Sequence, residues 1–276
     1  MTMNKPYTHN IIVLLALVAG VIAALSGCST TKEVEQLSVD KRFEKAIALF
    51  KNEDYLDAYE EFRIVTLQFQ GSKFADEAQF DMGECRFKRE EYVLAAYEYD
   101  VLVRTMPTSQ YVPRARYQRA MCYYRLAPAY YLDQTYTRQA VDEFQSFIEY
   151  HPTDSLVTQA EAKISELNIR LARKEYENGI TYIHMEYYKS ALNSFDHVLE
   201  KYHDTPYAEQ AQLMKADVQL RRNHVNDAKN EIEKFFMKYP NSSLKADAER
   251  LQKEILARPP QKPPVPAKTP AISSER

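Results

Sequence analysis

The 276-residue sequence is poor in glycine, in cysteine and in the short motifs that mark catalytic sites. It contains 5 glycines and 3 cysteines, and it has no G-x-S-x-G elbow and no glycine-rich phosphate loop. Its 6 histidines lack the H-E-x-x-H spacing of a zinc site, and no pair of cysteines supports one. These absences favour a protein that binds other molecules over one that catalyses a reaction.

An excess of charge of either sign is also missing. Lysine and arginine number 36, aspartate and glutamate number 39, and the formal net charge is −3. A nucleic-acid partner requires a basic face, so this balance argues against such a partner. The nearest approach to an acid and base pair is Asp196 beside His197. Adjacent helical positions do not face each other, so a solvated helix surface is expected there.

The first 27 residues differ in composition from all that follow. Lys5 supplies a positive start, and a nearly unbroken apolar run extends from Ile11 to Leu25. The run has the length of a secretory signal and is short for a membrane span. It ends in the tetrad Leu-Ser-Gly-Cys at Cys28, which is similar to a bacterial lipoprotein signal. We expect a signal peptide over 1–27, and the alternative is an ordinary secretory signal with an incidental cysteine.

Lipidation of Cys28 would tether the mature protein to a membrane. Acyl chains gain about 0.8 kcal/mol per buried methylene, and several chains together anchor a protein stably. Residues 28–37 would form the lipidated linker. Ser29 stands where an Asp would be the inner-membrane retention signal, and no acidic cluster directly follows Cys28. By resemblance to lipoprotein sorting, these features predict an outer-membrane location on the periplasmic face.

An internal repeat runs through the remainder of the chain. Five times an Ala is followed four residues later by a large apolar residue: Ala58/Phe62, Ala95/Tyr99, Ala140/Phe144, Ala191/Phe195 and Ala228/Ile232. In four units a second small residue stands twelve positions before the Ala, at Ala46, Gly83, Gly179 and Ala216. Two small residues at this spacing let paired helices approach closely, and the large residue fills the groove between them. The pattern is typical of stacked helical hairpins.

Proline marks the end of the second helix in three of the units, at Pro107, Pro152 and Pro240. It forces the residue before it away from α geometry. The combined arrangement resembles the tetratricopeptide repeat, whose usual length is about 34 residues. The sequence therefore predicts an all-α fold, a tetratricopeptide-like α-solenoid of about five helical hairpins.

Two of the repeat intervals are long, for different reasons. In the third unit the small residue is Ala120, twenty positions before Ala140, so the hairpin contains an eight-residue insertion at 127–134 (APAYYLDQ). In the fourth unit the surplus precedes Gly179, and its apolar period predicts one helix from about Leu156 to about Met185. We expect repeats one to three over 38–152, the long helix with repeats four and five over 153–257, and a disordered proline-rich tail over 258–276.

The remaining cysteines and the tyrosines need separate interpretations. Cys85 and Cys122 occupy equivalent places in neighbouring repeats. Such points lie too far apart for a disulfide, which needs a Cα separation below about 7 Å, so two buried thiols are expected. The third repeat and its insertion are rich in tyrosine, at Tyr117, Tyr123, Tyr124, Tyr130, Tyr131 and Tyr136. This cluster is either hairpin packing or a contact surface for another protein.

The order of these parts resembles the BamD family of lipoproteins. The likeness rests on the lipid site, the five repeats, the insertion PAYYLDQ, the motif F-x-x-F-I-x-x-x-P ending at Pro152, and the long helix with L-A-x-K-E from Leu171. The resemblance implies a non-enzymatic subunit of the β-barrel assembly machine with no cofactor beyond the diacylglycerol and N-acyl lipid on Cys28. Its partners would be a BamA-like barrel insertase and unfolded outer-membrane proteins.

The resemblance also implies where those partners bind. The N-terminal repeats would receive an extended substrate segment. Our candidates for the binding wall lie on first helices near the small residue: Phe43, Ile47, Phe50, Phe80, Glu84 and Phe87. The alternative is that several of these are simply core between hairpins. The C-terminal repeats would dock on the insertase, with Arg221 and Arg222 as candidate contacts.

Two other functions stay open at this point. A tetratricopeptide adaptor of another cell-envelope complex, such as one that coordinates peptidoglycan synthesis, would carry the same repeats and lipid. A wall-modifying hydrolase would need two carboxylates about 5 to 9 Å apart in a cleft. The acidic residues of this sequence are scattered over helix faces, which disfavours the hydrolase.

Overall fold

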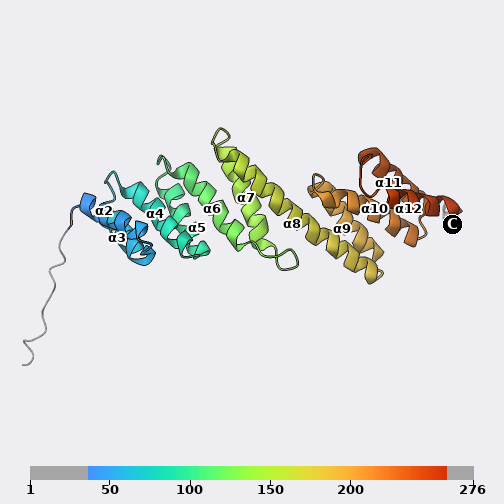
Figure 1. The fold of residues 1–276 in the computed structure, drawn as a ribbon, viewed down its shortest axis with the longest axis horizontal. Helices are drawn as coiled ribbons and strands as arrows, with labels where there is room; N and C mark the ends of the chain where they lie inside the picture. Colours follow the sequence, from blue (N-terminus) through green and yellow to red (C-terminus); the bar gives the residue numbers. More distant parts are fainter. Residues whose placement is uncertain (1–36, 260–276) are drawn as a thin grey trace, which may run out of the picture. The chain divides into compact units, whose positions relative to one another are not determined.

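The computed structural model describes residues 37–259, which form eleven α-helices and no strand (Figure 1). The helices are α2 (Val39–Lys51), α3 (Tyr55–Gln68), α4 (Ala75–Lys88), α5 (Tyr92–Thr105), α6 (Val112–Leu126), α7 (Thr135–Tyr150), α8 (Val157–His184), α9 (Tyr188–Lys201), α10 (Pro206–Arg221), α11 (Val225–Lys238) and α12 (Lys245–Ala257). The predicted signal peptide, all but the last residue of the predicted linker, and the predicted tail beyond Pro259 lie outside the described residues.

The chain divides into two units, residues 1–41 and 42–276, and the packing described here is that of the second unit. Its helices pair as hairpins: α2 with α3, α4 with α5, α6 with α7, α8 with α9, and α10 with α11. Each hairpin also packs on the next one along the chain. The prediction of an all-α tetratricopeptide-like solenoid with five hairpins is therefore confirmed.

One helix lies outside the five-hairpin pattern. Helix α12 follows the last hairpin and packs on α11 and α10. It buries Ala248 and Ile255 in the same cluster as Ile232 and Phe235 of α11. A terminal repeat needs a covering element because no further hairpin buries its apolar face. Helix α12 supplies that cover.

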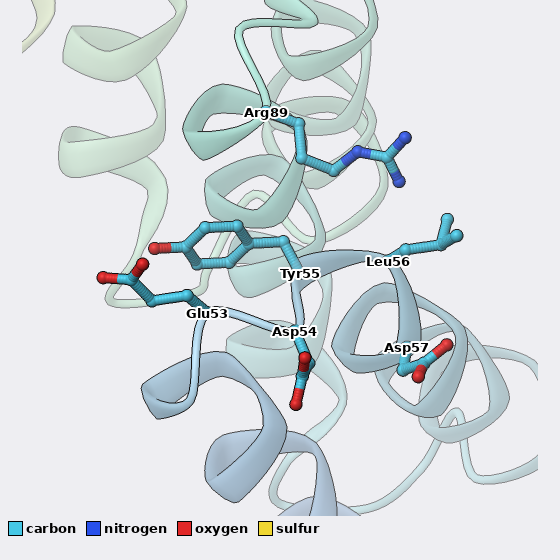
Figure 2. A pocket seen from close by; sticks show the side chains of 6 residues that line it. All are labelled: Glu53, Asp54, Tyr55, Leu56, Asp57 and Arg89. Carbon is cyan, nitrogen blue, oxygen red and sulfur yellow. The ribbon is translucent and has the colours of Figure 1, made fainter.

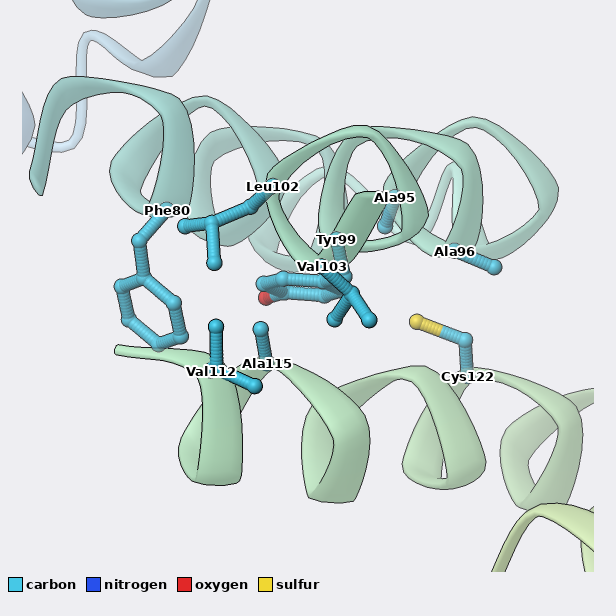
Figure 3. Packing of buried hydrophobic residues seen from close by; sticks show 9 residues of the cluster. All are labelled: Phe80, Ala95, Ala96, Tyr99, Leu102, Val103, Val112, Ala115 and Cys122. Atoms are coloured by element: carbon cyan, nitrogen blue, oxygen red, sulfur yellow. The ribbon is translucent and has the colours of Figure 1, made fainter. Parts of the chain in front are cut away.

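The predicted close approach of paired helices occurs at the two glycines. A Cβ added to Gly83 would lie 2.4 Å from the Tyr99 ring, and one added to Gly179 would lie 2.5 Å from the Phe195 ring. Both rings are fully buried. In Figure 3 the Tyr99 ring lies among buried residues of α4, α5 and α6, so one apolar cluster joins the second hairpin to the third. The small residue and the ring thus fix how closely each hairpin closes.

The structure confirms the two explanations given for the long repeat intervals, an inserted loop and a long helix. Helix α6 ends at Leu126 and α7 begins at Thr135, so the insertion 127–134 is the loop between them. Helix α8 has 28 residues, with Leu156 and Met185 as its capping residues. Its N-terminal and middle turns contribute Leu167 and Leu171 to the cluster of the third hairpin. Its second half contributes Ile183 to the cluster of the fourth hairpin.

Four of the hairpins contain the same type of tight turn between their two helices. Its central residue has positive φ and stands five positions before the repeat Ala, at Glu53, Glu90, Glu186 and Asn223. At Glu90, for example, the N–H donates to Phe87 O at 3.0 Å, and the next N–H, of Glu91, donates to Arg86 O at 3.0 Å. This is a Schellman arrangement, which satisfies the last carbonyls of the first helix. The third hairpin has the insertion instead.

Candidate functional site

Two of the six predicted wall residues are core residues. Phe43 is 8% exposed and Phe80 is 2% exposed. The Phe80 ring packs against the rings of Tyr99 and Tyr111, with centroids 5.5 and 5.4 Å away. A ligand could reach neither ring without opening the hairpins, because interiors of this kind are close-packed. For Phe43 and Phe80 the wall hypothesis is corrected to packing between hairpins.

The other four wall candidates are only partly buried. Phe50 and Phe87 are equivalent residues, and each makes an edge contact with the first tyrosine of the next helix, at 5.3 and 5.2 Å. Glu84 has a structural partner on either side, since its Oε1 accepts from the Tyr99 hydroxyl at 2.7 Å and from Gln118 Nε2 at 2.6 Å. For these residues and Ile47, substrate binding stays a prediction.

The predicted insertase contacts lie at the end of α10. Arg221 is exposed, and its Nε donates to Asp217 Oδ2 at 2.7 Å one turn back. Arg222 caps the helix, and its Nη1 donates to Gln219 Oε1 at 3.1 Å. Both guanidinium groups are thus within reach of a partner, and the contact itself stays a prediction.

A hollow of about 340 Å³ lies at the turn of the first hairpin (Figure 2). Its lining includes the carboxylates of Glu53, Asp54 and Asp57 together with Arg89 of the next hairpin. The three carboxylates point in different directions in Figure 2, and Arg89 pairs with Glu91 at 2.7 Å. General acid and base catalysis needs groups that converge on one reacting atom. This hollow does not present such an arrangement.

Asp196 and His197, the neighbouring acid and base noted in the sequence, bind different partners. Asp196 binds Lys215 Nζ at 2.5 Å, whereas the exposed His197 lies 3.8 Å from Glu175. Over residues 37–259 no cluster of His, Cys, Asp and Glu could hold a metal ion. Within the same range, no helix combines the length and the apolarity that crossing a bilayer requires.

Cys85 and Cys122 are free and buried, which confirms the prediction made from their spacing. Burial raises the pKa of the Cys85 thiol to about 12, and the nearby charges of Asp81 and Glu84 act in the same direction. Burial also raises the pKa of Cys122. Since the thiolate is the reactive form, both residues are structural.

The tyrosines of the third repeat divide between the two interpretations. Tyr117 is buried against Phe144 and Phe147. Tyr123 stacks on Tyr136 with ring centroids 6.3 Å apart. Tyr124 packs on the same cluster, and its hydroxyl donates to Glu166 of α8 at 2.8 Å. Tyr130 and Tyr131 instead lie in the insertion beside α8. Hairpin packing therefore explains part of the cluster and leaves the insertion tyrosines at the surface.

Sequence reasoning missed a buried polar pair that occurs in two hairpins. Gln79 Nε2 donates to Glu98 O at 3.0 Å and to Glu98 Oε2 at 2.9 Å. Gln212 Nε2 makes the same two bonds to Glu231, at 3.0 and 2.7 Å. The available signal was the common separation of nineteen residues, with Gln four positions before the small residue. These pairs satisfy buried polar groups at equivalent places in the stack.

Comparison of the sequence with known proteins identifies its family. The model of the YfiO family, described as outer membrane lipoprotein, matches residues 35–223. The chain belongs to the YfiO family. The outer membrane protein assembly factor BamD of Rickettsia prowazekii (strain Madrid E) is 25% identical over 239 residues, covering 86% of this chain and 94% of that protein. The resemblance to BamD seen in the sequence is thereby confirmed.

Two further comparisons are more limited. BamD of Caulobacter vibrioides (strain ATCC 19089 / CIP 103742 / CB 15) is 26% identical to this YfiO family member over 140 residues, covering 51% of this chain and 46% of that protein. Among solved structures, a TPR repeats protein (BF2334) from Bacteroides fragilis aligns with a TM-score of 0.43 at 11% identity. That alignment covers 80% of this chain and 98% of the other.

Proposed function

We propose that this chain is an outer-membrane lipoprotein subunit of the β-barrel assembly machine, a scaffold that binds unfolded outer-membrane proteins and the barrel insertase. The main support is membership of the YfiO family over residues 35–223. Both relatives from Rickettsia and Caulobacter carry the name outer membrane protein assembly factor. These names support a role in outer-membrane protein assembly, and we infer from that role that the chain binds unfolded outer-membrane proteins and the insertase.

The fold suits a scaffold because stacked hairpins present extended helix surfaces to other polypeptides. Ile47, Phe50, Glu84 and Phe87 are the candidate residues for an unfolded protein, and Arg221 with Arg222 are the candidates for the insertase. Reversing the charge of both arginines should abolish co-purification with the insertase. Arg250→Glu is the control, since Arg250 is an exposed arginine on α12 in a local pair with Asp247. Intact co-purification of the double variant would remove the arginines from the proposal.

The proposed anchor is lipid on Cys28, which lies outside the described residues. Acyl chains on that cysteine would hold the repeats at the periplasmic face of the outer membrane. Cys28→Ala should remove the protein from the outer-membrane fraction and remove the mass of the acyl groups. A Cys28→Ala protein that stays in the outer membrane would contradict the anchor.

Depletion of the protein in its native cell tests the proposal as a whole. A subunit of the assembly machine should lower the amounts of many barrel proteins together, and unfolded forms should accumulate in the periplasm. An adaptor of peptidoglycan synthesis would instead change wall synthesis while barrel proteins keep their normal amounts. Identification of the barrel protein that co-elutes from solubilised membranes gives an independent readout.

A further inference from the structure

The insertion of the third hairpin forms one side of a groove that the proposed function does not use. The groove has a volume of about 530 Å³ and lies between residues 127–131, the middle of α8 and the first turn of α10. Tyr130, Tyr131 and Tyr207 supply rings to its lining, Ile169 supplies an aliphatic side chain, and Arg173 supplies a cation. We call this the insertion groove. Its volume lies within the range of sites that bind a small ligand or a short chain segment.

Two cations of α8 hold the insertion in place. Arg170 Nη1 donates to the carbonyl oxygens of Ala127 and Pro128 at 3.0 and 3.1 Å. Lys174 Nζ donates to the carbonyl oxygens of residues 131 and 132 at 3.2 and 2.9 Å. Hydrogen bonds from charged donors are stronger than neutral ones. The loop is therefore bound to a rigid helix although it is an addition to the repeat.

A buried glutamine holds the loop from within. Gln134 Nε2 donates to the carbonyl oxygens of Ala129 and Leu132 at 2.9 and 3.1 Å. Its Oε1 accepts from the Thr137 hydroxyl at 2.8 Å. Most carbonyl groups of the insertion are thus already bonded. A partner cannot pair with this backbone as an added strand, so side chains must provide recognition.

The same loop exposes large apolar side chains. Tyr131 is 68% exposed and the neighbouring Leu132 is 50% exposed. Exposing them does not stabilise the fold, because apolar groups stabilise it when they leave water. A rigid surface that displays aromatic rings loses little conformational entropy on binding, which is the property of a prepared contact site.

One cation of the groove has spare capacity. The Arg173 guanidinium lies over the Tyr130 ring at 3.9 Å from its centroid, and its ion pair with Glu177 spans 4.0 Å. Glu166, the carboxylate of the groove, already accepts from the Tyr124 hydroxyl and pairs with Lys163 and Arg170. The ion pair with Glu177 uses Nε at the long distance of 4.0 Å, so the planar guanidinium of Arg173 can still take a second carboxylate through its terminal nitrogens.

We propose that the insertion groove binds an extended segment of a partner polypeptide that carries acidic side chains next to aromatic or large aliphatic ones. The apolar side chain packs among Tyr130, Tyr131 and Ile169, and the carboxylate pairs with Arg173. The complementarity of charge selects an acidic segment over a basic one. This inference goes beyond the assembly role and does not depend on it.

Three labelled peptides of equal length test the chemistry of the occupant. One alternates Phe with Asp, one alternates Phe with Lys, and one alternates Ala with Asp. Binding to the purified mature protein is measured by fluorescence anisotropy at physiological salt. The Phe-Asp peptide should bind, and the other two should bind about tenfold more weakly, since a lost charged pair or aromatic contact costs roughly that factor.

Two variants locate the binding in the groove. Arg173→Glu should reverse the preference, so that the Phe-Lys peptide binds more tightly than the Phe-Asp peptide. Tyr131→Ser should weaken binding of the Phe-Asp peptide about tenfold. Both side chains are on the surface, and circular dichroism verifies that the variants are folded.

Each variant has a matched control elsewhere in the chain. Lys229 pairs with Glu233 at the same spacing and the same 4.0 Å distance as Arg173 with Glu177. Tyr97 on α5 is 61% exposed, a fraction similar to the 68% of Tyr131. Lys229→Glu and Tyr97→Ser should bind the Phe-Asp peptide as the wild type does. The same loss in the controls would place the binding outside the groove and overturn the proposal.

The inference is overturned if the wild type does not bind the Phe-Asp peptide, if it binds the Phe-Lys peptide equally well, or if Arg173→Glu keeps the wild-type preference. None of these results bears on outer-membrane assembly, because the experiment contains no barrel protein and no membrane. Conversely, unchanged barrel proteins after depletion would refute the assembly role and leave the peptide preference standing. The two proposals can therefore fail separately.

Discussion

The second and third hairpins have the same core and different turns. Tyr99 and Phe144 occupy the equivalent ring position, and both are fully buried. The second hairpin turns through Glu90 with positive φ, whereas the third has the loop 127–134. The small residue, the Ala and the ring therefore fix how the two helices of each hairpin pack. The turn can therefore change without disturbing the stack.

The two turns also differ in where their stabilising contacts originate. The turn at Glu90 is satisfied locally by carbonyl oxygens at the end of α4. The insertion is satisfied by Arg170 and Lys174, which lie more than forty residues further along the chain. Both cations come from the middle of α8, the helix that is longer than the repeat requires. The long helix and the insertion are thus coupled parts of one local structure.

The largest expected effect comes from substituting Gly83, the small residue at which the helices of the second hairpin approach closely. The third hairpin has Ala120 where the second has Gly83. Gly83→Ala places a Cβ 2.4 Å from the Tyr99 ring, so it should destabilise the protein by about 1–3 kcal/mol. Urea unfolding measures this. Gly71→Ala is the control, since nothing lies within 4 Å of its added Cβ. A Gly83→Ala variant as stable as the control would show that the hairpins can separate freely.

The next largest effect concerns Asp81, a titratable residue of the second hairpin. Burial raises the pKa of Asp81 in the second hairpin to about 7, and Glu77 and Glu84 add to this, while Arg114 opposes it. Its folded-state pKa lies above the ordinary value, so its contribution is fully present below about pH 4 and is lost as the pH rises through 7. The free energy of unfolding of Asp81→Asn, relative to that of the wild type, should therefore be more favourable at pH 8 than at pH 5. The expected change is about 1–2 kcal/mol after allowance for screening.

Urea unfolding of both proteins at the two pH values gives the measurement for Asp81. Glu149→Gln, which removes an exposed carboxylate of the third hairpin, is the control. An equal difference between wild type and Asp81→Asn at pH 5 and pH 8 would refute the prediction.

The cations that hold the insertion should have a smaller and local effect. Arg170→Ala removes the donor to the Ala127 and Pro128 carbonyls and should cost about 1 kcal/mol. Hydrogen exchange of the insertion amides should accelerate, while the amides of the second hairpin keep their rates. Arg104→Ala is the control, because Arg104 is 62% exposed and forms a local pair with Asp100. Unchanged exchange in the insertion would mean that α8 does not hold the loop.

The smallest effect concerns the strained turn. Glu90 has φ of 61°, a conformation that costs a residue with a Cβ more than it costs glycine. Glu90→Gly should therefore stabilise the protein by about 0.5 kcal/mol, the balance between relieved strain and the greater freedom of glycine in the unfolded chain. The control Glu161→Gly, inside α8, should destabilise it by about 1 kcal/mol. Thermal unfolding compares the two, and a destabilised Glu90→Gly variant would contradict the prediction.

The sequence by itself determined the all-α repeat, the position of the insertion, the extent of α8 and the unpaired state of Cys85 and Cys122. These features follow from spacing along the chain, because helix period and small residues report directly which faces pack together. The tertiary structure alone decided that Phe80 is core while Phe87 is partly exposed, that Gln79 bonds Glu98, and that Arg170 holds the insertion. Such pairings depend on which neighbour covers a given face, and residues far apart in the chain meet there only after the hairpins have stacked.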